Sequence, residues 1–336
     1  MFLFEIGVDL GSSRFRMYIP HKGVVINERS LIALNELSGD IMSEGDSVEN
    51  IIGKTPPGIE LVYPIKRGVI NDLDMAVHMI KKYITGRTGS SVLRPKIAMT
   101  VPIVLTEVER NSLLKVALTC GARTVKTIPS PVAAAFGCGI DISLPNGRMV
   151  IDIGASVTDI AVMSLNSVVC GATVKIGGDD FTSSLIEGFE KHHGIRIGYL
   201  TAEDIKMNHT NFSKEFSVGG MSTGIKKFPH KVTSNAGEIR EMMLDTVQHL
   251  GEGINNVLEK TPPELISDII NNSIVICGGG AKLSGLDRFL KTRLNANIKI
   301  AEEPEFCAVK GAVNVFKNMD CESGSMTGVS RDRSES

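Results

Sequence analysis

Two short segments, one in each half of the chain, carry the residue types that bind phosphate. The first is Val8-Asp9-Leu10-Gly11-Ser12-Ser13, and the second is Ile151-Asp152-Ile153-Gly154-Ala155-Ser156. In each, an aspartate ends a strand-like apolar run and is soon followed by glycine and small residues. This pattern favours a tight turn whose backbone N–H groups face a phosphate, and the aspartate can reach a phosphate-bound Mg²⁺ through water. One such turn usually only reverses the chain, but two indicate two related halves that bind one nucleotide between them.

Two later segments can complete a nucleotide site. Gly278-Gly279-Gly280-Ala281 follows an apolar run, so its backbone can approach a flat ligand such as an adenine ring or a ribose. Taken alone, a glycine-rich turn without a ligand is the commoner interpretation. Glu203 and Lys206 lie one turn apart on a short helix that we expect to be introduced by Thr201. Their side chains either point at one ligand or form a solvated helix face.

The composition is that of an ordinary α/β protein. The chain has 336 residues, of which 42% are hydrophobic and 22% charged, and its formal net charge is −2. No overall basic field therefore favours nucleic acid as a partner, and the length predicts two lobes. The six cysteines form no CxxC pair and no zinc-binding spacing, which indicates free thiols in a reducing compartment. Since neither a membrane-spanning run nor a cleavable signal peptide is visible, we expect a cytoplasmic protein.

The order of apolar runs repeats in the two halves and predicts an α/β fold with two lobes. Each lobe has a mixed sheet flanked by helices, and the nucleotide lies in the cleft between them. We place the first lobe at residues 1–145, with a small inserted subdomain at about 32–64. The second lobe covers 146–320, with an insertion at about 181–244. Residues 321–336 are rich in Ser, Gly and Arg and are predicted to be a disordered tail.

Periodicity and end signals predict the individual elements. Strands are expected at residues 5–10, 15–19, 23–27, 96–101, 149–153, 159–164, 167–174 and 273–277. Helices are expected at residues 72–84, 106–119, 131–138, 179–192, 241–258 and 284–294. Thr106 with Glu109, and Thr261 with Glu264, have the spacing of a capping box at a helix start. The Ala-rich helix at 131–138 is small enough to pack closely on a sheet.

In this order, the two Asp-x-Gly segments and the three glycines resemble the actin, Hsp70 and sugar-kinase superfamily. Residues 53–59, 94–102, 259–265 and 274–287 are similar to the MreB/Mbl family of bacterial actins in particular. The resemblance extends from about residue 5 to residue 317. It implies an actin-like ATPase fold that binds ATP or ADP with Mg²⁺ and polymerises with itself. It also implies filaments on the inner face of the cytoplasmic membrane that determine cell shape and organise wall synthesis with membrane proteins of the elongation machinery.

The resemblance assigns roles by position. Asp9 and Asp152 match the aspartates that face Mg²⁺, and Asp152 is also placed among the catalytic residues. The phosphate hairpins correspond to Gly11, Ser12, Ser13, Gly154, Ala155 and Ser156. The nucleoside pocket corresponds to Glu203, Lys206, Gly278, Gly279, Gly280 and Ala281.

Three departures from the family pattern concern the phosphate end. Arg14 replaces a small or polar residue and can add a charge-assisted phosphate contact. The second hairpin, usually Gly-Gly-Gly-Thr-Thr-Glu, reads Gly-Ala-Ser-Val-Thr-Asp at 154–159, and the lost glycine and hydroxyl can weaken phosphate binding. Ser130 stands where the family has a glutamate that positions the attacking water. Because a hydroxyl is a poor base at neutral pH, we expect slow hydrolysis or none, with nucleotide binding retained.

Membrane contact is predicted at two apolar places. Phe2, Leu3 and Phe4 lie at the N-terminus, and Val92 and Leu93 lie in a loop with basic neighbours that suit anionic lipid. Val92 and Leu93 can instead pack beneath their own loop.

Three other functions are compatible with the same fold. One is a non-hydrolysing scaffold that co-assembles with an active paralogue, which Ser130 favours. A small-molecule kinase would need a carboxylate base beside a substrate cleft, and the sequence shows no clear candidate. A chaperone-like ATPase would need a substrate domain, for which the sixteen tail residues are too few.

Overall fold

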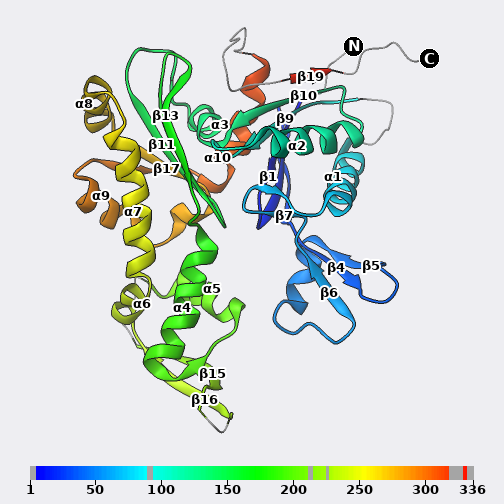
Figure 1. Cartoon of the computed structure of the whole chain (residues 1–336), viewed down its shortest axis with the longest axis vertical. Coiled ribbons are helices and arrows are strands. Elements are labelled where there is room, and N and C mark those ends of the chain that lie inside the picture. Colours follow the sequence, from blue (N-terminus) through cyan, green and yellow to red (C-terminus); the bar gives the residue numbers. More distant parts are fainter. Residues whose placement is uncertain (1–4, 89–93, 211–214, 225–226, 318–327, 331–336) are drawn as a thin grey trace.

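The computed structural model describes residues 5–88, 94–210, 215–224, 227–317 and 328–330. It shows two lobes side by side, each built on a sheet and each extended by a smaller subdomain (Figure 1). Phe2, Leu3, Phe4, Val92 and Leu93, the predicted membrane residues, lie outside the described residues.

The first lobe is formed mainly by the N-terminal part of the chain. Its sheet strands are β1 (Glu5–Leu10), β2 (Arg14–Ile19), β3 (Gly23–Arg29), β9 (Lys96–Val101), β10 (Thr124–Pro129) and β19 (Gly328–Ser330). Its helices are α1 (Leu73–Thr88), α2 (Glu107–Thr119) and α3 (Ser130–Gly137). The inserted subdomain and the hairpin after it comprise β4 (Ile32–Asn35), β5 (Ile41–Glu44), the 3₁₀ helix η1 (Gly45–Ile51), β6 (Ile59–Val62), β7 (Ile65–Lys66) and β8 (Val69–Ile70).

The second lobe has the corresponding parts. Its sheet strands are β11 (Arg148–Ile153), β12 (Thr158–Ser164), β13 (Ser167–Val174), β17 (Ile274–Cys277) and β18 (Ile298–Ile300). Its insertion holds α4 (Gly178–His193), β14 (Ile195–Arg196), α5 (Tyr199–Asn208), β15 (Phe216–Ser222), β16 (Pro229–Ser234) and α6 (Ala236–Met242). The remaining elements are α7 (Leu244–Glu259), α8 (Pro263–Asn272), η2 (Gly279–Lys282), α9 (Leu286–Leu294), η3 (Pro304–Phe306), α10 (Cys307–Ala312) and η4 (Val313–Phe316).

The two sheets share one topology, as the repeated sequence pattern predicts. The strand order is β3-β2-β1-β9-β10 in the first lobe and β13-β12-β11-β17-β18 in the second. In each, the first three strands form an antiparallel meander, and the strand that carries the Asp-x-Gly segment runs parallel to the next two. Each Asp-x-Gly turn therefore joins equivalent strands at equivalent places in the two lobes.

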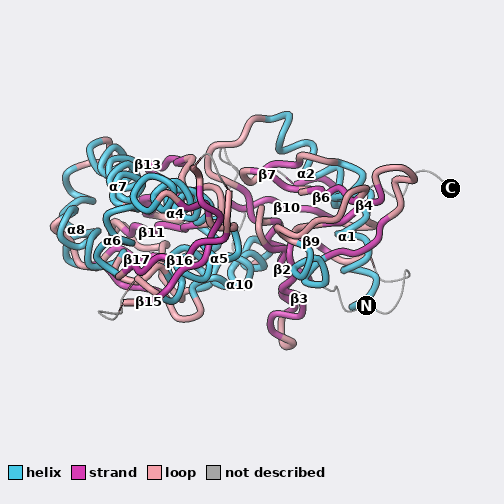
Figure 2. Tube along the Cα trace, turned by 90° about the horizontal axis from the view of Figure 1, so that it is seen from below, coloured by secondary structure: helices cyan, strands magenta, loops and turns pink. Residues whose placement is uncertain are grey.

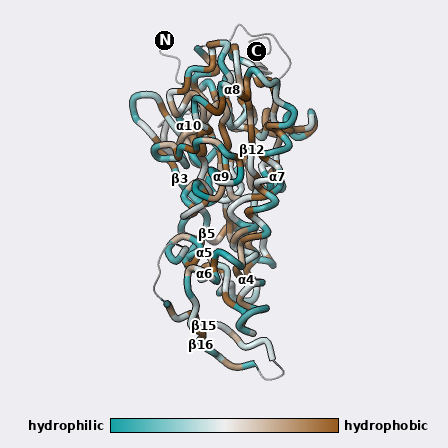
Figure 3. Tube along the Cα trace, turned by 90° about the vertical axis from the view of Figure 1, so that its left-hand side faces the viewer, coloured by the Kyte–Doolittle hydropathy of each residue, from teal (hydrophilic) through white to brown (hydrophobic). Residues whose placement is uncertain are grey.

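Each lobe has its own hydrophobic core. Strand β12 is buried at all of its positions, and α4 contributes the fully buried Phe181, Leu185 and Phe189 to the second core. In the first lobe, Phe15 and Met17 of β2 point into a core shared with α1 and α2. The most hydrophobic segments lie in the half of the molecule that contains the two large sheets, the upper half of Figure 3.

Helices α3 and α10 cross between the lobes at very short range. A Cβ atom on Gly137 would lie 1.9 Å from the Cys307 carbonyl oxygen, and one on Gly311 would lie 1.8 Å from that of Ala133. Figure 2 shows α10 between the two groups of strands. The Ala-rich helix packs on strands of both sheets, as its composition predicts, and it makes its closest approach to another helix. The two glycines permit this approach because they have no side chains, so the backbones of the two helices can lie in contact.

Several sequence predictions differ from the structure. The predicted helix 241–258 is two helices, α6 and α7, interrupted at Met243. The Thr106 capping box is present, but Thr261 donates its hydroxyl to the Val257 carbonyl oxygen and does not cap α8. Helix α5 begins at Tyr199, so Thr201 lies within it and does not introduce it.

The C-terminal part of the chain also differs from the predicted division. Helices α10 and η4 contact strands of the first lobe's sheet, so the chain returns to that lobe before residue 320. Within the predicted disordered tail, residues 328–330 form β19, which pairs antiparallel with β10. The other tail residues lie outside the described ranges.

We expect Gly311→Ala to lower the free energy of unfolding by about 2–3 kcal/mol or more, because its methyl group overlaps the Ala133 carbonyl oxygen. Gly251→Ala in α7 is the matched control: its nearest new neighbour is 3.5 Å away, and helix propensity should stabilise it by about 0.5–1 kcal/mol. Urea unfolding of both variants measures the effect. A Gly311→Ala protein as stable as the wild type would contradict the close approach.

Candidate functional site

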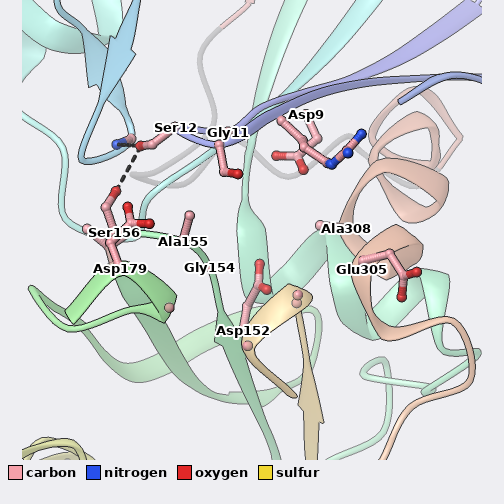
Figure 4. Close-up of a pocket in the computed structure, with 18 of the residues that line it drawn as sticks. Asp9, Gly11, Ser12, Asp152, Gly154, Ala155, Ser156, Asp179, Glu305 and Ala308 are labelled. Atoms are coloured by element: carbon pink, nitrogen blue, oxygen red, sulfur yellow. Dashed lines mark hydrogen bonds between the residues drawn. The ribbon is translucent and has the colours of Figure 1, made fainter. Parts of the chain in front are cut away.

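A cleft of about 550 Å³ lies between the lobes and collects most of the residues singled out from the sequence. Its walls come from the β1–β2 and β11–β12 turns, the starts of α3 and α4, helix α5, the glycines after β17, and η3. Figure 4 shows aspartates and small residues from both lobes facing one another across this space.

The two Asp-x-Gly turns meet across the cleft. The Ser156 hydroxyl donates to Ser12 Oγ over 2.8 Å, and the Gly68 amide donates to the same oxygen over 3.1 Å (Figure 4). A Cβ on Gly11 would approach the Arg14 carbonyl oxygen to 2.8 Å, and one on Gly154 would approach that of Val157 to 3.0 Å. The glycines therefore permit turns too tight for a side chain at those positions.

The two aspartates differ in their partners. Asp9 accepts a hydrogen bond from Thr100 Oγ1 on one carboxylate oxygen (2.8 Å) and from Arg16 Nη1 on the other (2.9 Å). Asp152 is half-buried and accepts a hydrogen bond from the Ser130 hydroxyl. Burial raises the pKa of Asp152 to about 6, against the Ser130 hydrogen bond, which lowers it. Both carboxylates line the cleft, but Asp9 already has a cationic partner and does not fit the role of a free Mg²⁺-facing group.

The glycines after β17 form the opposite wall. Gly278 has φ +80°, and a Cβ there would lie 2.3 Å from the Ile153 carbonyl oxygen and 2.4 Å from Asp152 Oδ1. A Cβ on Gly279 would meet no atom within 4 Å, so its backbone borders open space in the cleft. Ala281 does not line the cleft but is buried in the second core, which differs from the predicted pocket role.

Glu203 and Lys206 both line the cleft, but the lysine is tied to the protein. Lys206 Nζ donates to the Gly178 carbonyl oxygen (2.9 Å), to Thr182 Oγ1 (2.9 Å) and to Glu203. An ammonium group has three donors, and all three are used: two join α5 to α4, and the third contacts Glu203 within α5. Glu203 is therefore the member of the predicted pair that can face a ligand. Its side chain is 31% exposed.

The start of helix α4 is hydrogen-bonded to the second Asp-x-Gly turn. The Gly178 amide donates to the Gly154 carbonyl oxygen over 3.0 Å, and the Asp179 amide donates to that of Ala155 over 2.7 Å. The adjacent Asp179 accepts a hydrogen bond from the Tyr199 hydroxyl over 3.0 Å. The first turn of α4 and that of α5 thus border one end of the cleft.

The structure adds residues that sequence reasoning missed. Additional charged and polar residues that line the cleft are Arg16, Asn27, Arg29, Thr100, Asp159, Asp179, Lys282 and Glu305. Arg16 had a detectable signal, since it lies two positions after Arg14 on a predicted strand and therefore on the same face. Lys282 and Glu305, which are joined by a 2.5 Å ion pair, come from segments brought together only by the fold.

The chemistry of these residues fits a nucleotide. Buried polar atoms without a protein partner lie at Arg16 Nε, Arg29 Nε, Asn27 Oδ1 and Glu305 Oε2, all on cleft-lining residues. Among the described residues, no group of three or more His, Cys, Asp or Glu side chains is arranged to hold a metal ion. Within the same residues, no helix has the length and apolarity needed to cross a bilayer.

Two lobes of one topology around such a cleft define an actin-like fold. The MreB5 protein of Spiroplasma citri, solved with bound AMPPNP, aligns with a TM-score of 0.89 and 30% identity over 94% of this chain and 97% of that one. The ADP-bound form of MreB5 gives a TM-score of 0.88.

The sequence comparisons establish the family. The family model described as MreB/Mbl protein matches residues 4–323, and the chain belongs to this family. It is 34% identical to the cell shape-determining protein Mbl of Bacillus subtilis (strain 168), over 95% of this chain and 98% of Mbl. It is 33% identical to the cell shape-determining protein MreB of Escherichia coli (strain K12), over 97% of both.

Asp159 provides a test of the cleft's electrostatics. Its Oδ1 accepts hydrogen bonds from the Ile103 amide (3.0 Å) and from Thr173 Oγ1, and its strand partner across β11–β12 is Asp152. Burial is the main cause that raises the pKa of Asp159 to about 7, and Asp152 adds to it. The folded state therefore holds this proton more tightly than the unfolded state, so this group's contribution to stability falls as the pH rises from about 4 to 7.

We expect Asp159→Asn to stabilise the protein by about 4 kcal/mol at pH 8 and by less than about 2 kcal/mol at pH 5. The amide oxygen of asparagine can still accept both hydrogen bonds. Urea unfolding at the two pH values measures this difference, and the exposed Asp40→Asn should change stability by less than about 0.5 kcal/mol at either pH. A gain that does not depend on pH would show that the Asp159 carboxyl does not titrate in this range.

Proposed function

We propose that this protein is a nucleotide-binding, filament-forming bacterial actin that binds ATP and ADP in the cleft between its lobes. The observation that carries the proposal is the hydrogen bond between the two equivalent turns, from the Ser156 hydroxyl to Ser12 Oγ over 2.8 Å, in a cleft lined by open glycine backbone. Family membership supports filament formation, and the AMPPNP-bound structure of MreB5 supports nucleotide binding.

We further propose that hydrolysis is slow. The Ser130 hydroxyl is buried and donates a hydrogen bond to Asp152. Its oxygen can accept a hydrogen bond from a water, but a hydroxyl is too weak a base to remove a proton from that water. General-base assistance is typically worth about 10²–10⁴-fold in rate. Without a carboxylate at this position, the protein is expected to hold nucleotide longer than it hydrolyses it. A scaffold that co-assembles with an active paralogue is consistent with the same geometry.

The cellular role proposed here is control of cell shape and of cell-wall synthesis from the inner face of the cytoplasmic membrane. Two relatives that cover almost the whole chain, Mbl and MreB, are described as cell shape-determining proteins. Peripheral membrane contact, through the N-terminal and loop residues predicted above, and binding to membrane proteins of the elongation machinery belong to the same proposal. Family membership weighs against the small-molecule kinase alternative.

The proposal is tested by sedimentation and negative-stain imaging with ATP, with ADP and without nucleotide, on anionic liposomes and without them. We expect nucleotide-dependent filaments. Gly279→Leu should weaken nucleotide binding by at least about tenfold and abolish these filaments, because position 279 borders open space in the cleft. Gly219→Leu, at an equally open but exposed position outside the cleft, is the control for nucleotide binding. Filaments that form equally well with Gly279→Leu would separate polymerisation from this site.

Ser130→Glu is expected to increase phosphate release by about 10²-fold, because it restores a carboxylate that can orient and deprotonate water. Ser130→Ala removes the hydroxyl without adding a carboxylate and should leave the slow rate within about threefold of the wild type. Single-turnover phosphate release measures both. Brisk release by the wild-type protein, or an unchanged rate in Ser130→Glu, would show that another group activates the water.

A further inference from the structure

We propose that Arg16 is a built-in cation for the phosphates of the nucleotide, bound to Asp9 at the place where the family's aspartate faces Mg²⁺, so that nucleotide binding depends little on Mg²⁺. The inference rests on the proposed nucleotide site. It concerns which positive charge neutralises the phosphates, and it assigns that charge to the protein.

The position of Arg16 follows from the strand pattern. On β2, Phe15 and Met17 point into the core, so Arg14 and Arg16 lie on the opposite face, which borders the cleft. The β1–β2 register places Arg16 directly opposite Asp9. The β2–β3 register places Asn27 on the other side of Arg16. Three adjacent strands thus present the polar row Asp9, Arg16 and Asn27 to the cleft.

The contacts of Arg16 leave it incompletely satisfied. Its Nη1 lies 2.9 Å from Asp9 Oδ2, and the two side chains are only 15% and 17% exposed. Its Nε is buried and has no hydrogen-bond acceptor. A buried donor without an acceptor costs free energy, and charge-assisted hydrogen bonds to phosphate are among the stronger ones in proteins. A small movement of the guanidinium toward the cleft would give it phosphate oxygens as acceptors.

The charge balance at Asp9 explains the consequence for Mg²⁺. A divalent cation is attracted to this place by the negative charge of its aspartates. Here the positive charge of Arg16 offsets the charge of Asp9. The second oxygen of Asp9 accepts from Thr100. Glu305, which Figure 4 shows near Asp9, is paired with Lys282 over 2.5 Å and supplies no unpaired negative charge in its place.

The neighbouring arginines have different partners. Arg14 lies 3.3 Å from Asp46, and Arg29 lies 2.5 Å from Glu49, both in η1 of the inserted subdomain. These two ion pairs join the sheet of the first lobe to its subdomain. Arg16 is instead paired within the cleft to the aspartate at the phosphate end, which distinguishes it from them.

The test is the dissociation constant of a fluorescent ATP analogue with Mg²⁺ and with EDTA. For the wild-type protein, we expect the removal of Mg²⁺ to weaken binding by less than about tenfold. For Arg16→Leu, we expect binding in EDTA to weaken by a further factor of about 10–100, the usual range for a lost charged hydrogen bond, and binding with Mg²⁺ to weaken by less, because the cation can then face the freed Asp9. Arg16→Lys should retain part of the binding in EDTA.

Arg123→Leu, an exposed arginine of the same lobe outside the cleft, is the control, and thermal melting verifies that each variant is folded. A wild-type protein that loses more than about 100-fold in affinity in EDTA would overturn the inference, even if Arg16→Leu did not fold. Equal Mg²⁺ dependence in Arg16→Leu and the wild type would also overturn it. A wild-type protein that binds the analogue in neither buffer would instead overturn the proposed nucleotide site, and this inference with it.

Discussion

The close crossing of α3 and α10 is the constraint on which the arrangement of the cleft depends. Gly137 and Gly311 allow backbone to lie against backbone where these helices pass between the lobes. Helix α3 begins at Ser130, and α10 follows directly after η3. The starts of both helices therefore border the cleft.

Three carboxylates that line the cleft are paired with cations of the protein. Asp9 is paired with Arg16, Glu203 with Lys206, and Glu305 with Lys282. Asp152 and Asp159 instead accept hydrogen bonds from hydroxyl groups, and burial raises the pKa of both. A site so organised suits the binding of a polyanion, because Arg16 has a buried donor without an acceptor that a phosphate oxygen could satisfy.

The balance of charges in the cleft gives a physical interpretation of the positions at which the chain differs from the family pattern. Relatives about one-third identical to it share the fold over nearly its whole length. Ser130 stands where the family pattern has a carboxylate, whereas Arg14 and Arg16 add positive charge that borders the cleft. Under the proposed function, the first change slows hydrolysis and the second favours the binding of nucleotide. A filament subunit with this site would be stabilised by bound nucleotide for longer than one that hydrolyses it quickly.

The sequence by itself predicted the two-lobed fold and the repetition of its plan, and nearly all the nucleotide-site residues singled out from it line the cleft, because tight turns, buried strands and helix starts are determined by neighbouring residues. It failed where distant contacts decide. Helices α6 and α7 separate at Met243, Thr261 donates a hydrogen bond to α7, and Ala281 is buried in the second core. These outcomes depend on packing, which the periodicity of the sequence does not describe. The three acceptors that occupy Lys206, and the pairing of Arg16 with Asp9, depend on strand register and helix placement, so only the tertiary structure could decide them.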